Sequence, residues 1–282
     1  MSKRYTWKLK QRNLLLGDRT WIMGVLNVTP DSFSDGGQYG DPDRAFAHAL
    51  ELEDEGADIL DIGAESTRPG SARVSEGEEL RRLVPVLKKL KEKLRIPISV
   101  DTYKAAVAEK ALEHGAEIIN DSSGLALDPH LPKVISKWDA GLIINHMRGT
   151  PETWLKLPPL KDVMRTIHGE LEAAAHRALH SGIQKQQIAI DPGIGFGKRR
   201  EQNAEIIAKL SHLGTLDLPI VVGPSRKHFL KQDDQTGTEF ATAGAVAACA
   251  FNGAQIVRVH DVKAMKAVLE VVDSIRRSGE EE

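Results

Sequence analysis

The chain has 282 residues, of which 41% are hydrophobic and only 5% aromatic, so its core must be built mainly from Ile, Leu, Val and Ala. Its 38 Lys and Arg nearly balance its 40 Asp and Glu, which excludes the strong overall field used to bind nucleic acid or an acidic membrane. The single cysteine, Cys249, excludes an internal disulfide. Its surrounding run, AVAACAF, predicts a small buried residue rather than a catalytic thiol.

The first residues, MSKRYTWKLKQRNLLL, contain no long apolar run followed by a cleavage site. No run in the chain approaches the roughly 18 apolar residues that a membrane span needs. We therefore expect a soluble, cytoplasmic protein with no membrane or nucleic-acid partner. We expect residues 1–20 to form an extension, a short hairpin capping the main domain, which covers 21–277 and is followed by an acidic tail at 278–282.

Eight short segments rich in β-branched and aliphatic residues recur along the chain and predict buried strands. They cover residues 21–28, 57–64, 96–102, 116–122, 141–147, 187–193, 218–225 and 254–260. Segments with helical spacing lie between them, such as 42–56 and 76–94. Eight strand–helix units predict an α/β fold of the (β/α)8 TIM-barrel type. An open doubly wound sheet is the alternative, but no G-x-G-x-x-G motif follows the first strand.

Polar residues occur where each predicted strand ends. They are Asn27, Asp61 and Glu65, Asp101, Asn120 and Asp121, Asn145 and His146, Asp191, Ser225 to Lys227, and Arg258 and His260. In a barrel, the C-terminal ends of the strands meet at one mouth, where active sites lie. One such residue often only caps the next helix, but the whole set predicts a pocket lined by carboxylates, amides and cations.

Two long glycine-containing loops, 29–41 and 65–77, follow the first two predicted strands. Both exceed the usual length of about two to six residues for a strand-to-helix loop. They are interpreted either as lids that exclude water from the mouth or as surface loops without a role, because length alone does not separate the two.

Cations gather late in the chain, at 225–227 and 258–260. Arg258 and His260 are two residues apart, so on a strand both side chains point to the same face. The ends of strands seven and eight are the usual phosphate position in barrels, and Arg68 could close onto the same anion. Shielded Asp and Asn side chains recognise a ligand edge rich in N–H donors. Unless these cations are only solvated surface charges, the pattern predicts a phosphorylated, nitrogen-rich heterocycle as the ligand.

Eight ordered motifs resemble the dihydropteroate synthase family over residues 20–275. They are GVLNVTPDSFSDGG (24–37), DIGAESTRPG (61–70), ISVDT (98–102), INDSSG (119–124), HMRG (146–149), DPGIGFGK (191–198), GPSRK (223–227) and RVHDV (258–262). The resemblance implies a (β/α)8 barrel that condenses 6-hydroxymethyl-7,8-dihydropterin diphosphate with p-aminobenzoate. The products are 7,8-dihydropteroate and pyrophosphate, a step of folate biosynthesis. It also implies Mg2+ and a homodimer packed through late barrel helices.

The resemblance assigns a role to each matching residue. For the pterin slot it implies Asp101, Asn120, Asp191, Lys227 and Arg258. For the diphosphate it implies Asn27, Thr67, Arg68, Arg258 and His260, with Asn27 as the ligand to Mg2+. For the p-aminobenzoate pocket it implies Phe33, Pro69, Phe196, Lys227 and His228. The catalytic residues are then Asp35, Lys227, Arg258 and His260.

The reaction that the resemblance implies begins with departure of pyrophosphate. Asp35 would stabilise the resulting cation, and the amine of p-aminobenzoate would then attack it. The N-terminus of a helix after Ser225 is expected to receive the benzoate carboxylate. The chain departs from the commoner family pattern at Ala64, Pro224 and His228, of which the last two lie near that carboxylate. Sulfonamides, which mimic p-aminobenzoate, are expected inhibitors.

Two other functions fit parts of the pattern. A methyltransferase that moves a methyl group from a folate to a corrinoid would share the pterin slot, but it would need neither TPDSFSDGG nor the Arg258–His260 pair. A barrel that binds without catalysing is the second alternative. It is disfavoured because every expected polar residue is present.

Overall fold

The computed structural model describes residues 3–29, 41–66 and 70–279. Within these ranges, eight parallel strands form one sheet in the order β8-β7-β6-β5-β4-β3-β10-β9. The strands are β3 (Trp21–Asn27), β4 (Ile59–Gly63), β5 (Ile98–Asp101), β6 (Ile118–Asp121), β7 (Gly141–Asn145), β8 (Ile188–Asp191), β9 (Val221–Val222) and β10 (Ile256–Val259). A parallel bridge between Ile190 and Ile220 joins the two ends of the sheet. The predicted barrel is therefore confirmed, and the open-sheet alternative is wrong.

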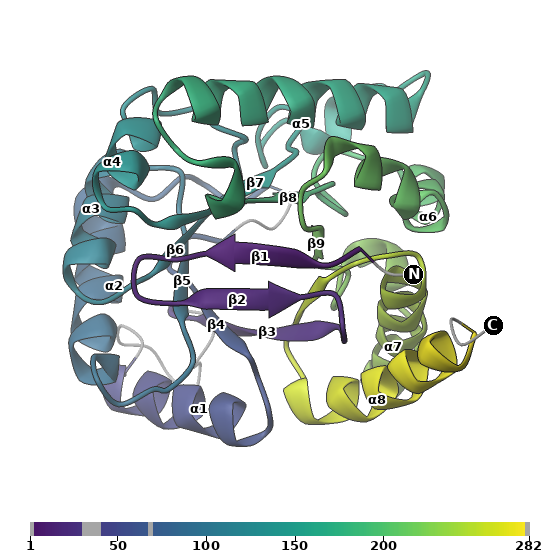
Figure 1. The fold of residues 1–282 in the computed structure, drawn as a ribbon, viewed down its shortest axis with the longest axis horizontal. Helices are drawn as coiled ribbons and strands as arrows, with labels where there is room; N and C mark the ends of the chain where they lie inside the picture. The colour runs from purple at the N-terminus through teal and green to yellow at the C-terminus, as the bar shows by residue number, and fades with distance from the viewer. Residues whose placement is uncertain (1–2, 30–40, 67–69, 280–282) are drawn as a thin grey trace.

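Helices surround this barrel as an outer ring (Figure 1). They are α1 (Pro42–Asp54), α2 (Glu76–Leu90), α3 (Ala105–Glu113), α4 (Leu131–Lys137), α5 (Val163–His180), α6 (Arg200–Ala208), α7 (Gln235–Phe251) and α8 (Val262–Ser278). Side-chain caps begin several of them, such as Ser75 for α2 and Asp162 for α5. The helix expected over 76–94 ends at Leu90, and Glu92 just beyond it has a φ of 62°.

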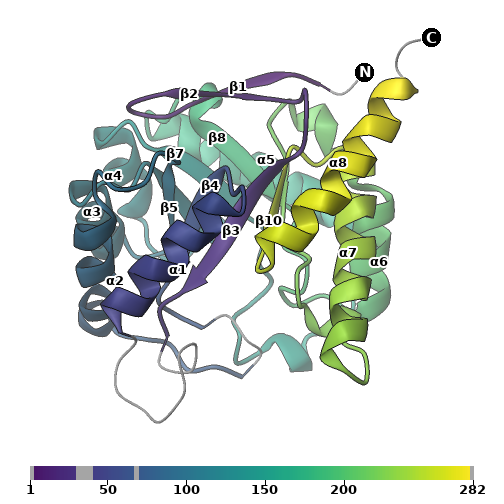
Figure 2. The same cartoon turned by 90° about the horizontal axis from the view of Figure 1, so that it is seen from below.

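Two apolar clusters stabilise the barrel, one between strands and helices and one inside the strands. The inner cluster contains Met23, Ile59, Ile118, Ile143, Ala189, Val221 and Ile256, all fully buried. The hairpin of β1 (Tyr5–Lys8) and β2 (Asn13–Leu16) lies across this end of the barrel (Figure 2). Its Trp7 joins the inner cluster and donates a hydrogen bond from Nε1 to the carbonyl of Gln187 at 2.9 Å. The hairpin therefore closes the bottom of the barrel.

Two further features follow from the packing. Cys249 on α7 is fully buried, and burial raises the pKa of its thiol, so the prediction of a core cysteine is confirmed. None of the helices in the described ranges is long and apolar enough to cross a membrane.

Candidate active site

A polar layer lies directly above the apolar floor of the barrel. Successive side chains on a strand point to opposite faces, so the residue two positions after an inner-cluster residue points inward as well. Those positions hold Asp61, Asn120, Asn145, Asp191 and Arg258, which follow Ile59, Ile118, Ile143, Ala189 and Ile256. The strand alternation therefore brings together charged and amide side chains from five different strands.

Arg258 connects two carboxylates at the centre of this layer. Its Nε donates to Asp61 Oδ2 at 2.6 Å, and its Nη2 donates to Asp101 Oδ2 at 3.3 Å. Asp61 has no exposed surface and also accepts from Ser99 Oγ at 2.6 Å and Asn120 Nδ2 at 3.3 Å. Burial opposes the charge of Arg258, but the two carboxylates outweigh it and raise its pKa. Asp61, Asp101, Asn120 and Arg258 thus form one hydrogen-bonded unit.

Asp101 ends β5 beside Asn27, which ends β3. The two side chains flank Gly63 of β4: a Cβ atom there would lie 3.5 Å from Asn27 Oδ1 and 3.8 Å from Asp101 Cβ. Burial, reinforced by Asp61, raises the pKa of Asp101 to about 7 against the opposing effect of Arg258. The alternative that Asp101 only caps the next helix is excluded, because α3 begins at Ala105 and the amide of Ala105 donates to Asp128.

Asp191 ends β8 opposite its register partner Asn145. Its Oδ1 accepts a hydrogen bond from the amide of Gly193 at 2.7 Å. Burial raises the pKa of Asp191 to about 6, while the surrounding cations oppose this rise. Within the described part of the chain, the buried Oδ1 atoms of Asn120 and Asn145 have no hydrogen-bond partner. Buried acceptors without donors suit a ligand that brings N–H groups.

Lys227 faces Asp191 from the loop after β9. Its Nζ lies 4.2 Å from the centre of the Phe196 ring, and the Phe196 ring meets Trp154 edge to face at 5.0 Å. Burial, followed by the nearby charge of Arg258, lowers the pKa of Lys227 to about 8. The structure thus places a cation, a carboxylate and an aromatic wall on one side of the mouth.

His260 follows β10, and Ser225 lies next to it on the neighbouring loop. His260 Nδ1 is 2.9 Å from Ser225 Oγ, and the His260 amide donates to the same oxygen at 3.3 Å. Ser225 is 5% exposed, so this contact is internal. Arg226, the next residue, has a φ of 55° and its Nε donates to Glu239 Oε1 at 2.6 Å. The turn 224–227 therefore directs Ser225 towards His260.

The helix expected after Ser225 is α7, which begins at Gln235. A short 3-10 turn, His228–Leu230, lies between Ser225 and this helix. The first turn of α7 is already capped by Asp234, whose carboxylate accepts from the amide of Gly237 at 2.6 Å. One amide at this helix end is therefore already satisfied, and the binding of a benzoate carboxylate there stays a prediction.

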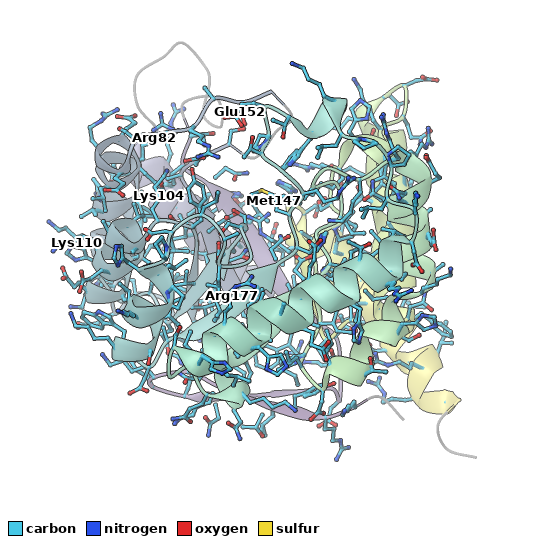
Figure 3. All side chains as sticks on the ribbon, turned by 90° about the horizontal axis from the view of Figure 1, so that it is seen from above. Arg82, Lys104, Lys110, Met147, Glu152 and Arg177 are labelled. Carbon is cyan, nitrogen blue, oxygen red and sulfur yellow. The ribbon has the colours of Figure 1, made fainter. Side chains whose placement is uncertain are left out.

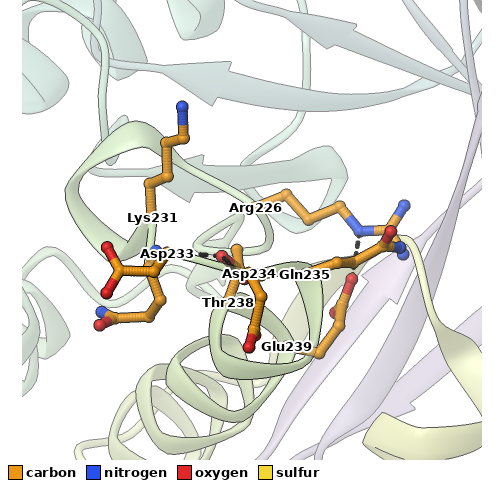
Figure 4. A pocket seen from close by; sticks show the side chains of 8 residues that line it. Arg226, Lys231, Asp233, Asp234, Gln235, Thr238 and Glu239 are labelled. Atoms are coloured by element: carbon orange, nitrogen blue, oxygen red, sulfur yellow. Dashed lines mark hydrogen bonds and ion pairs between the residues drawn. The ribbon is translucent and has the colours of Figure 1, made fainter.

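A surface pocket of about 350 Å³ lies beside that helix end (Figure 4). Its lining is Arg226, Lys231, Gln232, Asp233, Asp234, Gln235, Thr238 and Glu239. Three of these residues are acidic, and Glu239 already pairs with Arg226. The pocket does not fit an anionic ligand. His228 is exposed at the edge of the neighbouring 3-10 turn.

Five predicted site residues lie outside the described ranges: Phe33, Asp35, Thr67, Arg68 and Pro69.

The base of the second loop, which begins at Glu65, is described, and buried charged side chains hold it in place. Glu65 accepts from Lys104 Nζ at 2.5 Å and from Tyr103 Oη at 3.1 Å, and Lys104 also donates to Glu79 at 2.5 Å. Arg82, labelled with Lys104 in Figure 3, donates from Nη1 to the carbonyl of Ala64 at 2.9 Å.

The polar strand ends already placed Asp61 and Asn145 in the predicted pocket, but the sequence gave neither a specific role. The structure makes Asp61 the partner of Arg258 and places Asn145 beside Asp191. Lys198 was missed as a site residue, and its only sequence signal was its place at the end of the motif DPGIGFGK. His146, by contrast, is buried with its Nε2 3.0 Å from Glu170 of α5, so it faces the helices and not the mouth.

The family of pterin-binding enzymes matches this chain over residues 23–260. That range begins within the first barrel strand and ends at His260, so it reaches all eight strands and every described residue of the polar layer. The fold and the mouth thus define a pterin-binding enzyme.

Curated relatives identify the family more closely. The dihydropteroate synthase of Synechocystis sp. is 42% identical over 93% of this chain and 92% of its own length. The Bacillus subtilis enzyme is 39% identical over 93% and 90%. The crystal structure of Yersinia pestis dihydropteroate synthase with a sulfonamide drug complex superposes with a TM-score of 0.88, at 38% identity, over 98% of this chain and 100% of that one. The chain belongs to the dihydropteroate synthase family, whose members are transferases.

Proposed function

We propose that the chain condenses 6-hydroxymethyl-7,8-dihydropterin diphosphate with p-aminobenzoate to give 7,8-dihydropteroate and pyrophosphate. The observation that carries this proposal is the polar layer above the apolar floor, in which unpaired acceptors lie beside cations. A flat ligand with N–H donors on one edge and a diphosphate on the other matches that division. The Xanthomonas albilineans dihydropteroate synthase, solved with 4-aminobenzoic acid, superposes on this chain with a TM-score of 0.86 at 40% identity over 98% of this chain and 99% of that one.

The pterin slot consists of Asp101, Asn120, Asp191, Lys227 and Arg258 in this proposal. Asp191, when ionised, accepts two N–H groups from the ring edge, which a single carboxylate can do. The Asn120 oxygen faces another donor, since its amide nitrogen is already bound to Asp61. Lys227 reaches the ring acceptors as a point charge. Each buried polar atom then gains a partner on binding, which gives the slot its specificity.

The diphosphate site is assigned to Asn27, Arg258 and His260, with Thr67 and Arg68 as further expected residues. Arg258 provides a fixed guanidinium, held by Asp61 and Asp101 before substrate arrives. A cation that is already oriented stabilises the departing pyrophosphate without reorganisation in the transition state. His260, supported by Ser225, adds a donor beside it.

Mg2+ belongs to the same proposal. The side-chain oxygen of Asn27, at the end of β3, and the carboxylate of Asp101, at the end of β5, lie on either side of Gly63 of β4. Such a sparse oxygen set fits Mg2+, which takes few protein ligands and many from waters and substrate phosphate. No group of three or more His, Cys, Asp or Glu that could hold a metal occurs in the described ranges, which fits an ion recruited with the diphosphate. When bound, the ion would neutralise phosphate charge.

The proposed order of events is pyrophosphate departure followed by amine attack. The carbon that loses pyrophosphate becomes a cation conjugated with the electron-rich dihydropterin ring, and Asp35 is the residue expected to stabilise it. The neutral amine of p-aminobenzoate is a modest nucleophile, so a strong electrophile must form first. Phe196 and Lys227 form one wall of the proposed benzoate pocket, and His228, Phe33 and Pro69 are further residues expected there. A closed pocket would exclude water from the cation. Sulfonamides are expected to compete in this pocket.

A pyrophosphate-release assay tests the reaction. Release that requires both the pterin diphosphate and p-aminobenzoate, with equimolar dihydropteroate, is the expected result. Methyl transfer from a methylated folate without pyrophosphate release would instead support the methyltransferase. A folded protein that binds pterin but releases nothing, and that fails to rescue a folate-auxotrophic bacterium, would support the non-catalytic barrel.

The homodimer is also proposed. Phe240 and Phe251 on α7 are 74% and 60% exposed, and Val271 and Ile275 on the adjacent α8 are 59% and 57% exposed. Exposed apolar side chains on two helices that pack together are typical of an interface. Light scattering of the purified protein is expected to give twice the chain mass, and Phe240→Lys is expected to reduce it towards the monomer. A monomeric wild-type protein would refute this part.

A cytoplasmic location completes the proposal. Its support is the buried thiol of Cys249, since a free cysteine suits a reducing compartment. Fractionation of the source cells tests it, and recovery of the protein in the secreted fraction would overturn it.

A further inference from the structure

Lys198 is a buried cation that sequence reasoning left without a role. It ends the glycine-rich loop after β8 and is only 9% exposed. Its Nζ donates to three backbone carbonyls: Gly193 at 2.7 Å, His146 at 2.9 Å and Phe196 at 3.3 Å. An ammonium group carries three protons, so these three carbonyls satisfy it in its charged form. We call Lys198 and these three carbonyl groups the cage. It is unusual because all of its acceptors are neutral.

The cage joins two loops at the mouth. His146 directly follows β7, whereas Gly193 and Phe196 belong to the loop after β8. The two loops approach so closely that a Cβ atom on Gly193 would lie 1.9 Å from the carbonyl oxygen of His146. Gly193 has a φ of 69°, and Gly195 and Gly197 are also in the left-handed region, at 84° and 69°. Backbone of this kind has little intrinsic preference for one shape, so Lys198 fixes it.

The hydrogen bonds of Lys198 affect the proposed substrate site in two ways. First, the Phe196 carbonyl is held by Lys198, and the Phe196 ring is the wall on which the Lys227 ammonium rests. Second, Gly193 links Lys198 to Asp191, because its carbonyl accepts from Lys198 Nζ at 2.7 Å and its amide donates to Asp191 Oδ1 at 2.7 Å. Burial lowers the pKa of Lys198 well below its ordinary value, and Asp191 opposes this effect. The charged form of Lys198 in turn favours the ionised form of Asp191. Among the described residues, no carboxylate forms an ion pair with Lys198, so its charge acts on Asp191 without being cancelled by a contact.

We propose that Lys198 is a positioning residue for both substrates: it holds Phe196 against the p-aminobenzoate pocket and keeps a positive charge behind Asp191. The inference rests on the proposed function for the identity of the two pockets. It assigns no contact between Lys198 and substrate, because Lys198 acts through Phe196 and Asp191.

A double-mutant cycle of Lys198→Met and Phe196→Ala tests the first part. Met keeps the length of the side chain but removes the charge and all three donors. We expect Lys198→Met to raise the KM for p-aminobenzoate about tenfold, and Phe196→Ala to do the same. The double variant is expected to be little worse than either single variant, because both remove the same wall. Additive losses would overturn the positioning role.

The pH dependence of pterin binding tests the second part. The charged or titratable groups that face Asp191 are Lys198, Lys227, Arg258 and, from α7, Cys249. Pterin affinity of the wild type is expected to fall as the pH drops through about 6, where Asp191 becomes protonated. Lys198→Met removes a cation that favours the carboxylate, so the fall is expected to begin at a higher pH. Lys198→Arg keeps the charge and is expected to leave the midpoint unchanged. An unchanged midpoint in Lys198→Met would refute the electrostatic part.

Controls separate positioning from loss of fold. Leu83→Ala removes a fully buried side chain on α2, far from the loop, and is expected to lower the melting temperature without changing either KM or the pH midpoint. If Lys198→Met does not fold, Lys198→Arg still tests the cage. Its planar fork cannot reproduce three converging bonds, so an unchanged p-aminobenzoate KM would count against the proposal. If Phe196→Ala leaves that KM unchanged, it is the proposed benzoate pocket that fails.

Discussion

The two ends of the barrel differ in how their polar groups are satisfied. At the bottom, fully buried aliphatic side chains lie under the hairpin, and the one indole N–H of Trp7 has a carbonyl partner. At the mouth, two buried amide oxygens have no partner within the described ranges, and two carboxylates have raised pKa values. The packing at the bottom stabilises the fold. The unpaired and buried polar groups at the mouth lower the stability of the free protein, and a bound ligand would offset this loss.

The largest expected effect comes from the bottom. Ile118→Ala removes most of a fully buried side chain from the inner cluster, so it is expected to lower the free energy of unfolding by about 2–5 kcal/mol. Pterin affinity of the folded protein is expected to change little. Denaturant unfolding measures the stability, and calorimetry measures the pterin affinity. A large loss of affinity in a fully folded variant would contradict the separation of stability at the bottom from binding at the mouth.

At the mouth, Asp191→Asn is expected to weaken pterin binding by more than tenfold. It replaces one acceptor oxygen by a donor in a site that faces ring N–H groups. Calorimetry with a pterin ligand measures the change. Asp162→Asn, which keeps a good cap on α5 at the outer ring, is the matched control and is expected to leave affinity unchanged. Equal affinity in Asp191→Asn and wild type would exclude the proposed contact.

The raised carboxylate pKa values predict how stability of the free protein changes with pH. Asp101 and Asp191 have folded pKa values of about 7 and about 6, above the ordinary 3.8. The folded protein therefore binds more protons than the unfolded chain between these values, so stability is expected to fall as the pH rises from about 4 to about 7. For Asp191 the loss is about 3 kcal/mol, since each pKa unit corresponds to about 1.4 kcal/mol. Asp191→Asn should flatten this part of the curve, and an unchanged slope in the variant would contradict the prediction.

The smallest expected effect concerns Asn145. Its unpaired oxygen beside Asp191 predicts that Asn145→Ala weakens pterin binding by about threefold, the usual value of one neutral hydrogen bond. Asn145→Ala is also expected to leave stability nearly unchanged, since no bond in the free protein is lost from that oxygen. Tighter pterin binding by the variant would show that the amide does not face the ligand.

Strand periodicity was enough to predict the barrel, because buried parallel strands are recognisable as continuous apolar runs. The polar strand ends predicted Asp101, Asn120, Asp191 and Arg258, which the structure brings to one mouth. The pairing of Arg258 with Asp61, 197 residues apart, could not be predicted, since local patterns carry no information on which strand ends touch. The cage around Lys198 could not be predicted either, because its acceptors are backbone carbonyls from two different loops.

The turn between Ser225 and the next helix could not be predicted either. Arg226 takes a positive φ, and the chain makes a short 3-10 turn before α7 begins at Gln235. The interaction that holds this turn, between Arg226 and Glu239 of α7, is again tertiary. Roles that fall on Phe33, Asp35, Thr67, Arg68 and Pro69 stay predictions.

The hairpin at the bottom has a consequence for how the chain is made. Trp7 leaves the ribosome among the first residues, yet the surface that receives it includes Ile143, Ala189, Val221 and Ile256. The indole must therefore wait, uncovered, until nearly the whole polypeptide has been synthesised. Burial of Trp7 therefore accompanies completion of the barrel. The fluorescence of this indole is expected to report the last step of folding.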